Sequence, residues 1–314
     1  MSTRSQAITS LPAPAHAAAT ASDHEAVPAW LDVEAYPFAH HWIDLAQGRM
    51  HYVDEGTGAP VLLIHGTPTW SFEYRHVISA LAPHARVIAP DHLGFGLSAR
   101  PRHFAYAPEA HSENLLELID RLDLHNVTLV VHDFGGPIGL RLALDRPDRI
   151  ARIVIINSWL WPFDDDAVMA KRARMAGGWV GKFLYKYFNA SLRLIMPSAY
   201  GNRAALTTRI HRQYLEVFRN RDARVRVLHQ LAVSLLGSSA YYSRLHDRME
   251  ELRRRPVLIV WGLKDSAFQP YQLERWRREL PEATVVTVDQ AGHWPHEEAP
   301  DAVIAAIGQF AGIR

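Results

Sequence analysis

Hydrophobic positions along the chain fall into short runs that are separated by amphipathic stretches. Eight runs predict β-strands, and several are apolar at nearly every position, such as VTLVV at 127–131 and VLIVW at 257–261. Strands of this kind are typical of a parallel sheet that helices cover on both faces. The predicted strands are 41–45, 50–54, 61–65, 87–90, 127–132, 150–157, 257–261 and 284–288.

Between these runs, apolar residues recur at the spacing of helices. The clearest predicted helices are 72–81, 108–122, 136–144 and 271–280. Strands that alternate with helices indicate an α/β fold with a doubly wound, mostly parallel, eight-stranded sheet.

The alternation stops after the sixth predicted strand. Residues 159–255 have helical and loop character without a convincing buried strand, and the next strand begins after Pro256. An insertion of this length is too long for an ordinary connection between strands. We therefore expect a helical cap at 159–255, inserted into a core formed by residues 30–158 and 256–314.

The first 29 residues differ from the rest in composition. They are rich in Ala, Ser, Thr and Pro and poor in large apolar side chains, so they cannot offset the entropy of ordering. Ala15-His16-Ala17 is similar to a signal-peptide cleavage site, but Pro12 and Pro14 interrupt the apolar run that a signal peptide needs. We expect a disordered tail over 1–29 and a cytoplasmic protein.

Composition and charge exclude several classes of function. The chain has 314 residues, 48% of them hydrophobic, and no Cys, which rules out disulfide scaffolds, thiolate zinc sites and cysteine nucleophiles. Lys+Arg 34 against Asp+Glu 33 argues against a nucleic-acid partner. No run approaches the roughly 20 apolar residues of a membrane span, so no membrane partner is expected. The 18 His show no metal-ligand spacing, and we expect neither metal nor cofactor.

The strongest chemical signal lies at the end of the fifth predicted strand. There the sequence VHDFGG at 131–136 follows the strand and precedes a helix, which is the context of a nucleophile elbow. Asp133 occupies the nucleophile position, and Gly135 and Gly136 let strand and helix pass closely. The chain has no G-x-S-x-G, which argues against a serine esterase. A buried Asp that merely ends a strand is the structural alternative.

Two further residues appear in the order expected for a catalytic triad. Asp265 follows the strand at 257–261, and His293 lies in the loop QAGH after the last strand. Nucleophile, acid and histidine follow this order in α/β-hydrolases. Because each residue follows a predicted parallel strand, we expect all three at one edge of the sheet.

With these motifs the chain resembles the haloalkane dehalogenase family, the aspartate-nucleophile branch of the α/β-hydrolases. The resemblance covers about residues 30–312 and implies an α/β-hydrolase fold. It also implies that Asp133 attacks substrate, His293 activates water and Asp265 orients His293. Members place the third acid either there or after the sixth strand, where this chain has Asn157. Besides the elbow, the resemblance rests on HGTPTWSF at 65–72, DHLGFGLS at 91–98 and LLGSSAYY at 235–242.

The residue types fit a two-step hydrolysis of a small, apolar substrate by water. A carboxylate displaces a leaving group from an sp³ carbon and forms an ester on Asp133. His293 then deprotonates a water that attacks this ester. The backbone N–H groups of Phe134 and Thr67 match the oxyanion positions of such folds.

The chain departs from the family at the leaving-group site. Haloalkane dehalogenases stabilise the halide with two side-chain N–H donors, normally a Trp after the nucleophile and often an Asn after His-Gly. Here these positions hold Phe134 and Thr67. The sequence offers Trp70, Trp159, Trp161 and Trp179 as replacement donors, and we favour Trp159. We also expect Trp70 and Trp159 to bind the substrate.

Other functions remain open at this point. An epoxide hydrolase uses the same triad together with cap tyrosines, and a strained lactone would also suit the nucleophile. A non-catalytic ligand receptor on the same fold is a third possibility. Neither the substrate nor the oligomeric state follows from the sequence. The candidate tyrosines are Tyr185, Tyr187, Tyr200, Tyr214, Tyr241 and Tyr242.

Overall fold

A computed structural model gives the structure of the protein and describes residues 27–313. By contacts between Cα atoms the chain separates into residues 1–31 and 32–314, and each unit is described by itself. In the first unit only residues 27–31 are described, with a turn at Ala29 and Trp30. The tail expected over 1–29 therefore lies almost entirely outside the described residues.

The second unit is built on one sheet of eight strands, as predicted. The strands lie in the order β1-β2-β4-β3-β5-β6-β7-β8. β1 pairs with β2 and β2 with β4 in antiparallel fashion, and all other pairs are parallel. The strands are β1 (His40–Leu45), β2 (Gly48–Glu55), β3 (Pro60–Ile64), β4 (Arg86–Pro90), β5 (Val127–Asp133), β6 (Ile150–Ser158), β7 (Val257–Gly262) and β8 (Thr284–Val288).

The centre of the sheet forms the core. Every residue of β5 and of β7 is buried, which agrees with the nearly continuous apolar runs at 127–131 and 257–261. The register aligns Leu129 of β5 with Leu62 of β3 and Ile153 of β6, so branched side chains stack across the strands. β8 is half-exposed because it lies at an edge of the sheet.

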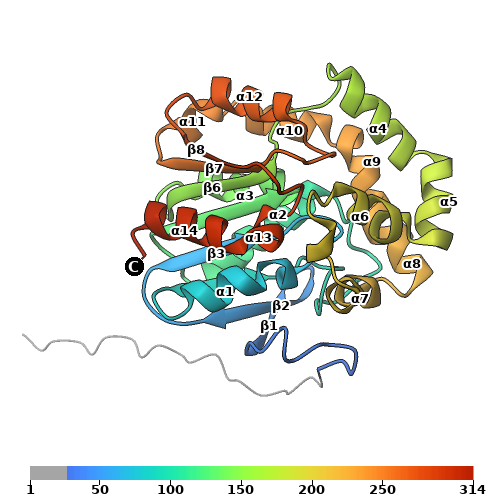
Figure 1. Ribbon diagram of the computed structural model, residues 1–314, viewed down its shortest axis with the longest axis horizontal. Helices are drawn as coiled ribbons and strands as arrows, with labels where there is room; N and C mark the ends of the chain where they lie inside the picture. Colours follow the sequence, from blue (N-terminus) through green and yellow to red (C-terminus); the bar gives the residue numbers. More distant parts are fainter. Residues whose placement is uncertain (1–26, 314) are drawn as a thin grey trace, which may run out of the picture. The chain divides into compact units, whose positions relative to one another are not determined.

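Helices cover both faces of the sheet (Figure 1). The helices α1 (Arg75–Leu81), α13 (Pro295–Glu298) and α14 (Pro300–Ala311) contact one another on the nearer face, and α2 (Pro108–Arg121) contacts α3 (Gly135–Asp145) on the other. The helix predicted at 271–280 is α12 (Pro270–Glu279). The helix predicted at 72–81 begins instead with the 3₁₀ turn η1 (Ser71–Tyr74), because Tyr74 has φ −91° and ψ 6°.

The segment between β6 and β7 contains no strand among its described residues, as expected. Most of its helices lie beside the sheet at the right of Figure 1, and its last two lie at the top near α12. None of the helices that the structure describes is long and apolar enough to span a bilayer. The division into a core and a cap at 159–255 stays a prediction. Its elements are α4 (Ala167–Gly177), α5 (Trp179–Phe188), the π-helical turn η2 (Ser191–Ile195), α6 (Met196–Ala199), η3 (Arg203–Ala205), α7 (Thr208–Val217), α8 (Arg221–Ala223), η4 (Arg224–His229), α9 (Gln230–Gly237), α10 (Ser239–His246) and α11 (Met249–Arg253).

Candidate active site

The turn between β5 and α3 presents Asp133 at the carboxyl edge of the sheet. Asp133 has φ 51°, a left-handed conformation that is costly for a residue other than Gly. The residues after it pass close to the rest of the sheet. A Cβ on Gly135 would lie 2.3 Å from the carbonyl oxygen of Ile64, and one on Gly136 would lie 1.9 Å from Oγ of Ser158. Small side chains are therefore required at both positions.

Asp133 is buried, with 6% of the residue exposed, and its carboxylate is held from two sides. The backbone N–H of Thr67 donates to Oδ1 at 2.9 Å, and Nε2 of His293 lies 3.4 Å from Oδ2. Gly66 packs directly against this side chain, since a Cβ on it would lie 2.4 Å from Cβ of Asp133. The nucleophile candidate thus has one fixed oxygen and one oxygen that faces the histidine.

His293 is in turn bonded to Asp265. Its Nδ1–H donates to Oδ2 of Asp265 at 2.7 Å, and the backbone N–H of Ala267 donates to the other oxygen at 2.6 Å. Both His293 and Asp265 are buried. The three residues that the sequence placed in a triad are therefore brought together at the ends of β5, β7 and β8.

Asn157 holds the acid in place, a role that the sequence reasoning missed. Its side-chain N–H donates to Oδ2 of Asp265 at 2.8 Å, and its Oδ1 accepts the backbone N–H of Gly262 at 2.8 Å. Asn157 belongs to β6 and Gly262 ends the neighbouring strand β7. The adjacency of these two strands is the signal that could have revealed the contact.

The charges of the two triad carboxylates determine the protonation state of His293. Burial alone would lower the pKa of His293, but the negative charges of Asp265 and Asp133 outweigh burial and raise this pKa to about 10. His293 therefore carries a proton at neutral pH. An ester on Asp133 removes one of these charges, which lowers the pKa of His293 toward the range of a useful base.

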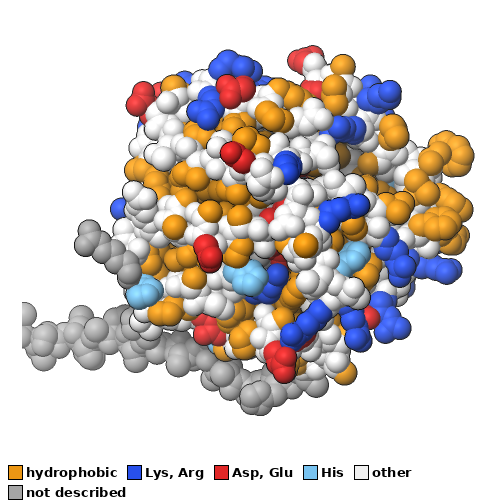
Figure 2. All heavy atoms as spheres, in the orientation of Figure 1, with side chains coloured by type: hydrophobic (Ala, Val, Ile, Leu, Met, Phe, Trp, Pro, Cys, Tyr) orange, Lys and Arg blue, Asp and Glu red, His pale blue; other side chains and the backbone are white. Residues whose placement is uncertain are grey.

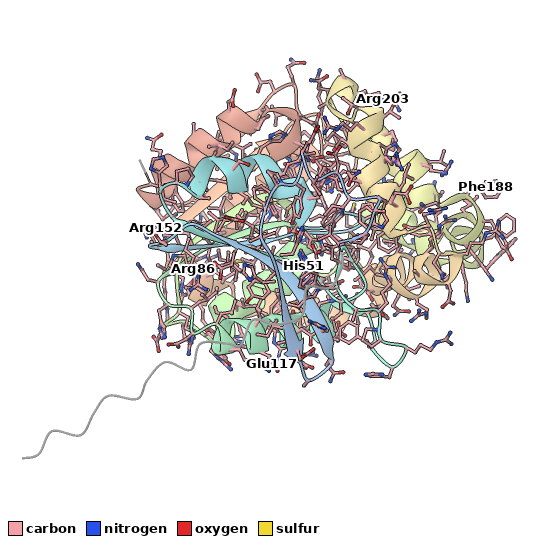
Figure 3. All side chains as sticks on the ribbon, turned by 90° about the horizontal axis from the view of Figure 1, so that it is seen from below. His51, Arg86, Glu117, Arg152, Phe188 and Arg203 are labelled. Atoms are coloured by element: carbon pink, nitrogen blue, oxygen red, sulfur yellow. The ribbon has the colours of Figure 1, made fainter. Side chains whose placement is uncertain are left out.

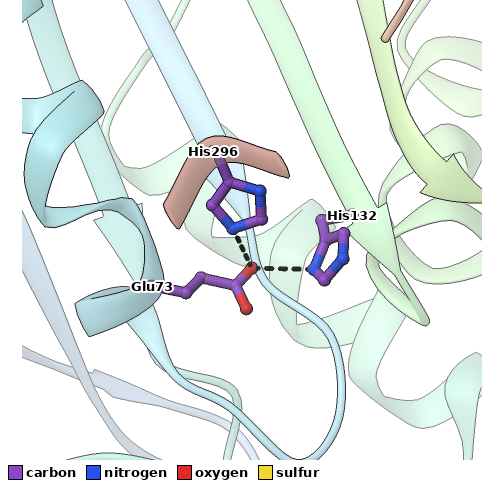
Figure 4. Close-up of side chains that lie close together, drawn as sticks. All are labelled: Glu73, His132 and His296. Atoms are coloured by element: carbon purple, nitrogen blue, oxygen red, sulfur yellow. Dashed lines mark hydrogen bonds and ion pairs between the residues drawn. The ribbon is translucent and has the colours of Figure 1, made fainter. Parts of the chain in front are cut away.

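A second buried cluster is formed by Glu73, His132 and His296 (Figure 4). Nε2–H of His132 donates to the backbone carbonyl of His293 at 2.8 Å, and Nδ1 of His132 lies 3.1 Å from Oε1 of Glu73. Nε2 of His296 lies 3.7 Å from the same Glu73 oxygen. His132 thus fixes the backbone carbonyl of His293.

Glu73, His132 and His296 could also be read as metal ligands. Their ligand atoms lie within 4.8 Å of one another, and all three side chains are buried. Burial holds the pKa of His296 well below its ordinary value, so this ring is neutral, and its nitrogens have no hydrogen-bond partner among the described residues. His132 already uses both ring nitrogens in the contacts with His293 and Glu73. The absence of a metal stays a sequence-based prediction.

A cavity of about 540 Å³ opens above Asp133 and His293. Thr67, Phe134 and Trp159 also line it. The ring of Trp159 meets that of Phe134 edge to face at 4.7 Å. Most of the remaining wall comes from the segment between β6 and β7 and is apolar, including Met169, Met175, Leu184, Leu194, Ile195 and Leu228.

The tryptophans weighed in the sequence differ in their surroundings. Trp159 lines the cavity, and its Nε1 is buried without a hydrogen-bond partner among the described residues. Trp70 does not line the cavity and packs against Tyr36 at 5.0 Å. Trp161 donates to Gln272 at 3.2 Å, and Trp179 is 83% exposed.

Thr67 offers a second donor beside the nucleophile. Its Oγ1 is buried and has no hydrogen-bond partner in the described part of the chain. A buried donor without a partner destabilises the folded protein. A ligand that accepts a hydrogen bond from Thr67 Oγ1 relieves this penalty and therefore binds more tightly. Thr67 and Trp159, which both line the cavity, thus each carry a side-chain donor without a partner among the described residues.

Of the six candidate tyrosines, Tyr185 alone lines the cavity. Burial raises its pKa to about 12. The others are engaged or face away: Tyr200 and Tyr214 donate to Glu297, Tyr241 to the carbonyl of Pro137 and Tyr242 to that of Ser234, while Tyr187 is exposed.

Comparisons with known proteins point in the same direction. Residues 59–300 match the family described as α/β hydrolase fold. Haloalkane dehalogenase 2 of Mycobacterium tuberculosis is 37% identical over 278 residues, which cover 88% of this chain and 96% of that protein. The cis-3-alkyl-4-alkyloxetan-2-one decarboxylase of Shewanella oneidensis is 33% identical over 282 residues, with 87% and 88% covered.

A solved structure supports the fold. The crystal structure of haloalkane dehalogenase DbeA from Bradyrhizobium elkani superimposes with a TM-score of 0.78 at 24% sequence identity, covering 88% of this chain and 98% of that one. At this identity the likeness concerns the fold alone. The α/β-hydrolase fold expected from the sequence is confirmed.

Proposed function

The chain belongs to the haloalkane dehalogenase family of the α/β hydrolases, and we propose that it hydrolyses the carbon–halogen bond of small haloalkanes. The observation that carries the proposal is the carboxylate of Asp133, which lies at the base of a largely apolar cavity with His293 3.4 Å away. Such a cavity suits an apolar substrate of a few carbon atoms together with water.

In the first step Asp133 acts as the nucleophile. A carboxylate oxygen attacks the halogen-bearing carbon, the carbon–halogen bond breaks, and the halide leaves with the bonding electron pair. Thr67 Oγ1–H and Trp159 Nε1–H are the donors we assign to the departing halide. They replace the two N–H groups that the family resemblance implies, and Phe134 adds only the positive edge of its ring.

In the second step His293 acts as the base. Once the ester has removed the charge of Asp133, His293 gives up its bound proton to solvent, and it then takes a proton from a water molecule, which attacks the ester carbonyl on Asp133. The backbone N–H of Thr67, already 2.9 Å from Oδ1, and that of Phe134 stabilise the oxyanion that forms. Collapse of this intermediate releases the alcohol and restores the carboxylate. Loss of one such donor typically costs about 3–4 kcal/mol.

Three residues position His293 without touching the reacting atoms. Asp265 orients the imidazole through Nδ1, Asn157 holds Asp265, and His132 holds the backbone carbonyl of His293. The negative charge of Asp265 also stabilises the imidazolium that forms when His293 accepts a proton.

Halide release tests the proposal directly. The purified protein is incubated with bromoalkanes of several chain lengths, and bromide and protons are measured. We expect equal amounts of both, and Asp133→Asn, a variant of nearly the same shape, should release neither. A folded wild-type protein that releases no bromide from any of these substrates would falsify the proposal.

Trapping the intermediate tests the assignment of the two steps. His293→Ala should still form the ester but fail to hydrolyse it. Mass spectrometry should then find one alkyl group on a peptide containing Asp133 and bromide released once per protein molecule. Continued turnover by this variant would mean that another group activates water.

A strained lactone is a second candidate substrate. Two observations favour it. The side chain of Phe134 has no N–H to donate to a halide, and one relative is named an oxetanone decarboxylase. Asp133 would attack the sp³ ring carbon, and the leaving carboxylate would stay tethered to the substrate, so no halide site is needed. Consumption of a β-lactone without bromide release from bromoalkanes would favour this candidate.

Epoxide opening rests on Tyr185, which lines the cavity. If this reaction occurs, Tyr185→Phe should abolish epoxide hydrolysis and leave bromide release unchanged.

A cytoplasmic location and the absence of a nucleic-acid partner remain predictions from the sequence.

A further inference from the structure

Helix α5 carries an apolar face that points away from the protein. Its exposed residues form two rows at the four-residue spacing of neighbouring positions on a helix. The inner side of the helix is formed by Gly181 and Tyr185, which are buried. The outer rows are Trp179, Phe183 and Tyr187, and Val180, Leu184 and Phe188.

The apolar surface continues beyond α5. Met175 at the end of α4 is 67% exposed, and Leu194 and Ile195 of η2 are 60% and 47% exposed. Figure 2 shows hydrophobic side chains gathered at the edge of the molecule where α5 lies in Figure 1. In Figure 3, Phe188 lies at the outer end of this segment, across the molecule from Arg86 and Arg152. We call the exposed apolar side chains of residues 175–195 the apolar face.

The surroundings of the apolar face are strongly basic. Residues 167–195 contain six Lys and Arg and neither Asp nor Glu, although the whole chain is nearly balanced in charge. None of the six forms an ion pair with a described residue, although Arg172 donates to the backbone carbonyls of Ser266 and Ala267. Lys182 and Lys186 lie on α5 itself, next to the outer rows. The six are Lys171, Arg172, Arg174, Lys182, Lys186 and Arg193.

The same segment forms part of the cavity wall. Met175, Leu184 and Ile195 are exposed and also line the cavity above Asp133. The apolar face is therefore continuous with the lining of the cavity.

We propose that the apolar face docks on the surface of an anionic lipid bilayer. An outward helix face with Trp, Phe and Leu, flanked by Lys and without acidic residues, is the composition of helices that lie in a membrane interface. The apolar rows enter the boundary of headgroups and acyl chains, and the cations contact the lipid phosphates. Patches of this kind are rarely left uncovered on soluble monomers.

A second copy of the chain is a poorer occupant. A two-fold interface places the same patch on both partners face to face. The cations of this segment that form no ion pair, among them Lys182 and Lys186, would then approach those of the other copy, which is unfavourable. Anionic lipid complements both the apolar and the basic part of the surface. The sequence predicted no membrane partner because it contains no spanning segment, whereas docking needs only an exposed face.

Docking has a consequence for the reaction that rests on the proposed function. Apolar substrates dissolve in bilayers, and the docked face lies beside the cavity wall. Lipid binding is measured without substrate. A failure of the proposed haloalkane hydrolysis therefore leaves the docking proposal testable, and a failure of docking leaves the hydrolysis testable.

Vesicle sedimentation tests the proposal. The full chain is mixed with vesicles of phosphatidylcholine, either alone or with added phosphatidylglycerol. We expect sedimentation with the anionic vesicles, less with the neutral ones, and less again at high salt. The double variants Trp179→Ser with Phe183→Ser, and Lys182→Glu with Lys186→Glu, should each reduce binding by about tenfold or more.

A matched charge reversal serves as the control. Arg277→Glu with Arg278→Glu changes the same charge on the exposed side of α12 and should leave sedimentation within about twofold of the wild type. Circular dichroism checks that each variant is folded. Absence of binding to anionic vesicles overturns the proposal, as does binding that both α5 variants retain. Self-association that Trp179→Ser abolishes, without lipid binding, would assign the face to a second copy instead.

Discussion

The side chain of Asn157 donates a 2.8 Å hydrogen bond to the Asp265 oxygen that also accepts the Nδ1–H of His293. Oδ2 of Asp265 therefore accepts hydrogen bonds from both the Asn157 amide and the His293 imidazole. The family resemblance places the third acid at either of these two positions, and here they touch. The neutral residue at one position supports the charged residue at the other.

Exchange of these two residues should show that only one acid is needed. Asp265→Asn should lower kcat by about 10³- to 10⁴-fold, since His293 loses the partner that orients and charges it. Adding Asn157→Asp should restore a large part of the activity, because the carboxylate is then supplied from β6. Steady-state bromide release measures both effects. Asn157→Asp alone should be destabilised, because two carboxylates then meet; an exchange variant as inactive as Asp265→Asn would contradict this prediction.

The charge coupling between His293 and Asp133 predicts a dependence of stability on pH. The pKa of His293 is raised from 6.5 to about 10 in the folded chain, so the proton is bound more tightly in the folded than in the unfolded state. The stability that this contributes is fully present below pH 6.5 and is lost as the pH rises through about 10. The free energy of unfolding, measured with urea across this range, should therefore fall with pH.

Asp133→Asn isolates the part of this effect that comes from the nucleophile. The variant removes one negative charge beside His293, so the pKa of His293 should fall and the loss of stability above pH 6.5 should become smaller. NMR titration of the His293 ring checks the pKa directly. Identical titration of His293 in both proteins would contradict the coupling.

Gly66 should tolerate no side chain. Gly66→Ala places a Cβ 2.4 Å from Cβ of Asp133 and must displace the nucleophile or the loop that carries Thr67. We expect a loss of activity of at least about 100-fold, because small misplacements of a reacting group are costly. Gly237→Ala on α9 is the control, since its nearest neighbour lies 3.8 Å away, and it should keep full activity. Kinetics and thermal melting of both variants give the comparison.

Leaving-group stabilisation should depend on Trp159 and Thr67. Trp159→Phe and Thr67→Val each keep most of the side-chain volume and remove the donor, so each should lower kcat for bromoalkanes by about 10- to 100-fold. The control is Trp261→Phe, whose Nε1 is also buried without a partner among the described residues but does not line the cavity. Unchanged bromide release by both cavity variants would assign the halide to other groups.

The fold followed from the sequence because its signals are local. The apolar runs of β5 and β7 marked buried parallel strands, and the strand at 284–288 was predicted with the same ends that the structure has. The elbow at Asp133 was recognisable because strand, turn and two glycines are adjacent in the sequence. Where prediction and structure differ, as at Tyr74, backbone angles within one helix are the cause.

Contacts between distant elements could not be read in the same way. His132 bonds to His293 and Trp70 packs with Tyr36, yet their neighbours in the sequence give no sign of either partner. The spacing of the apolar residues of α5 predicts a helix but not the direction of its apolar face. A pattern of apolar residues is the same whether a helix turns them inward or outward.

The insertion leaves and rejoins the sheet at neighbouring strands. β6 and β7 pair directly, so both ends of the segment between them connect to adjacent strands of the sheet. Mutations and changes of length in this segment can reshape the cavity while the register that holds Asp133 and Asp265 stays the same. The chemistry and the substrate range can therefore evolve separately in this architecture.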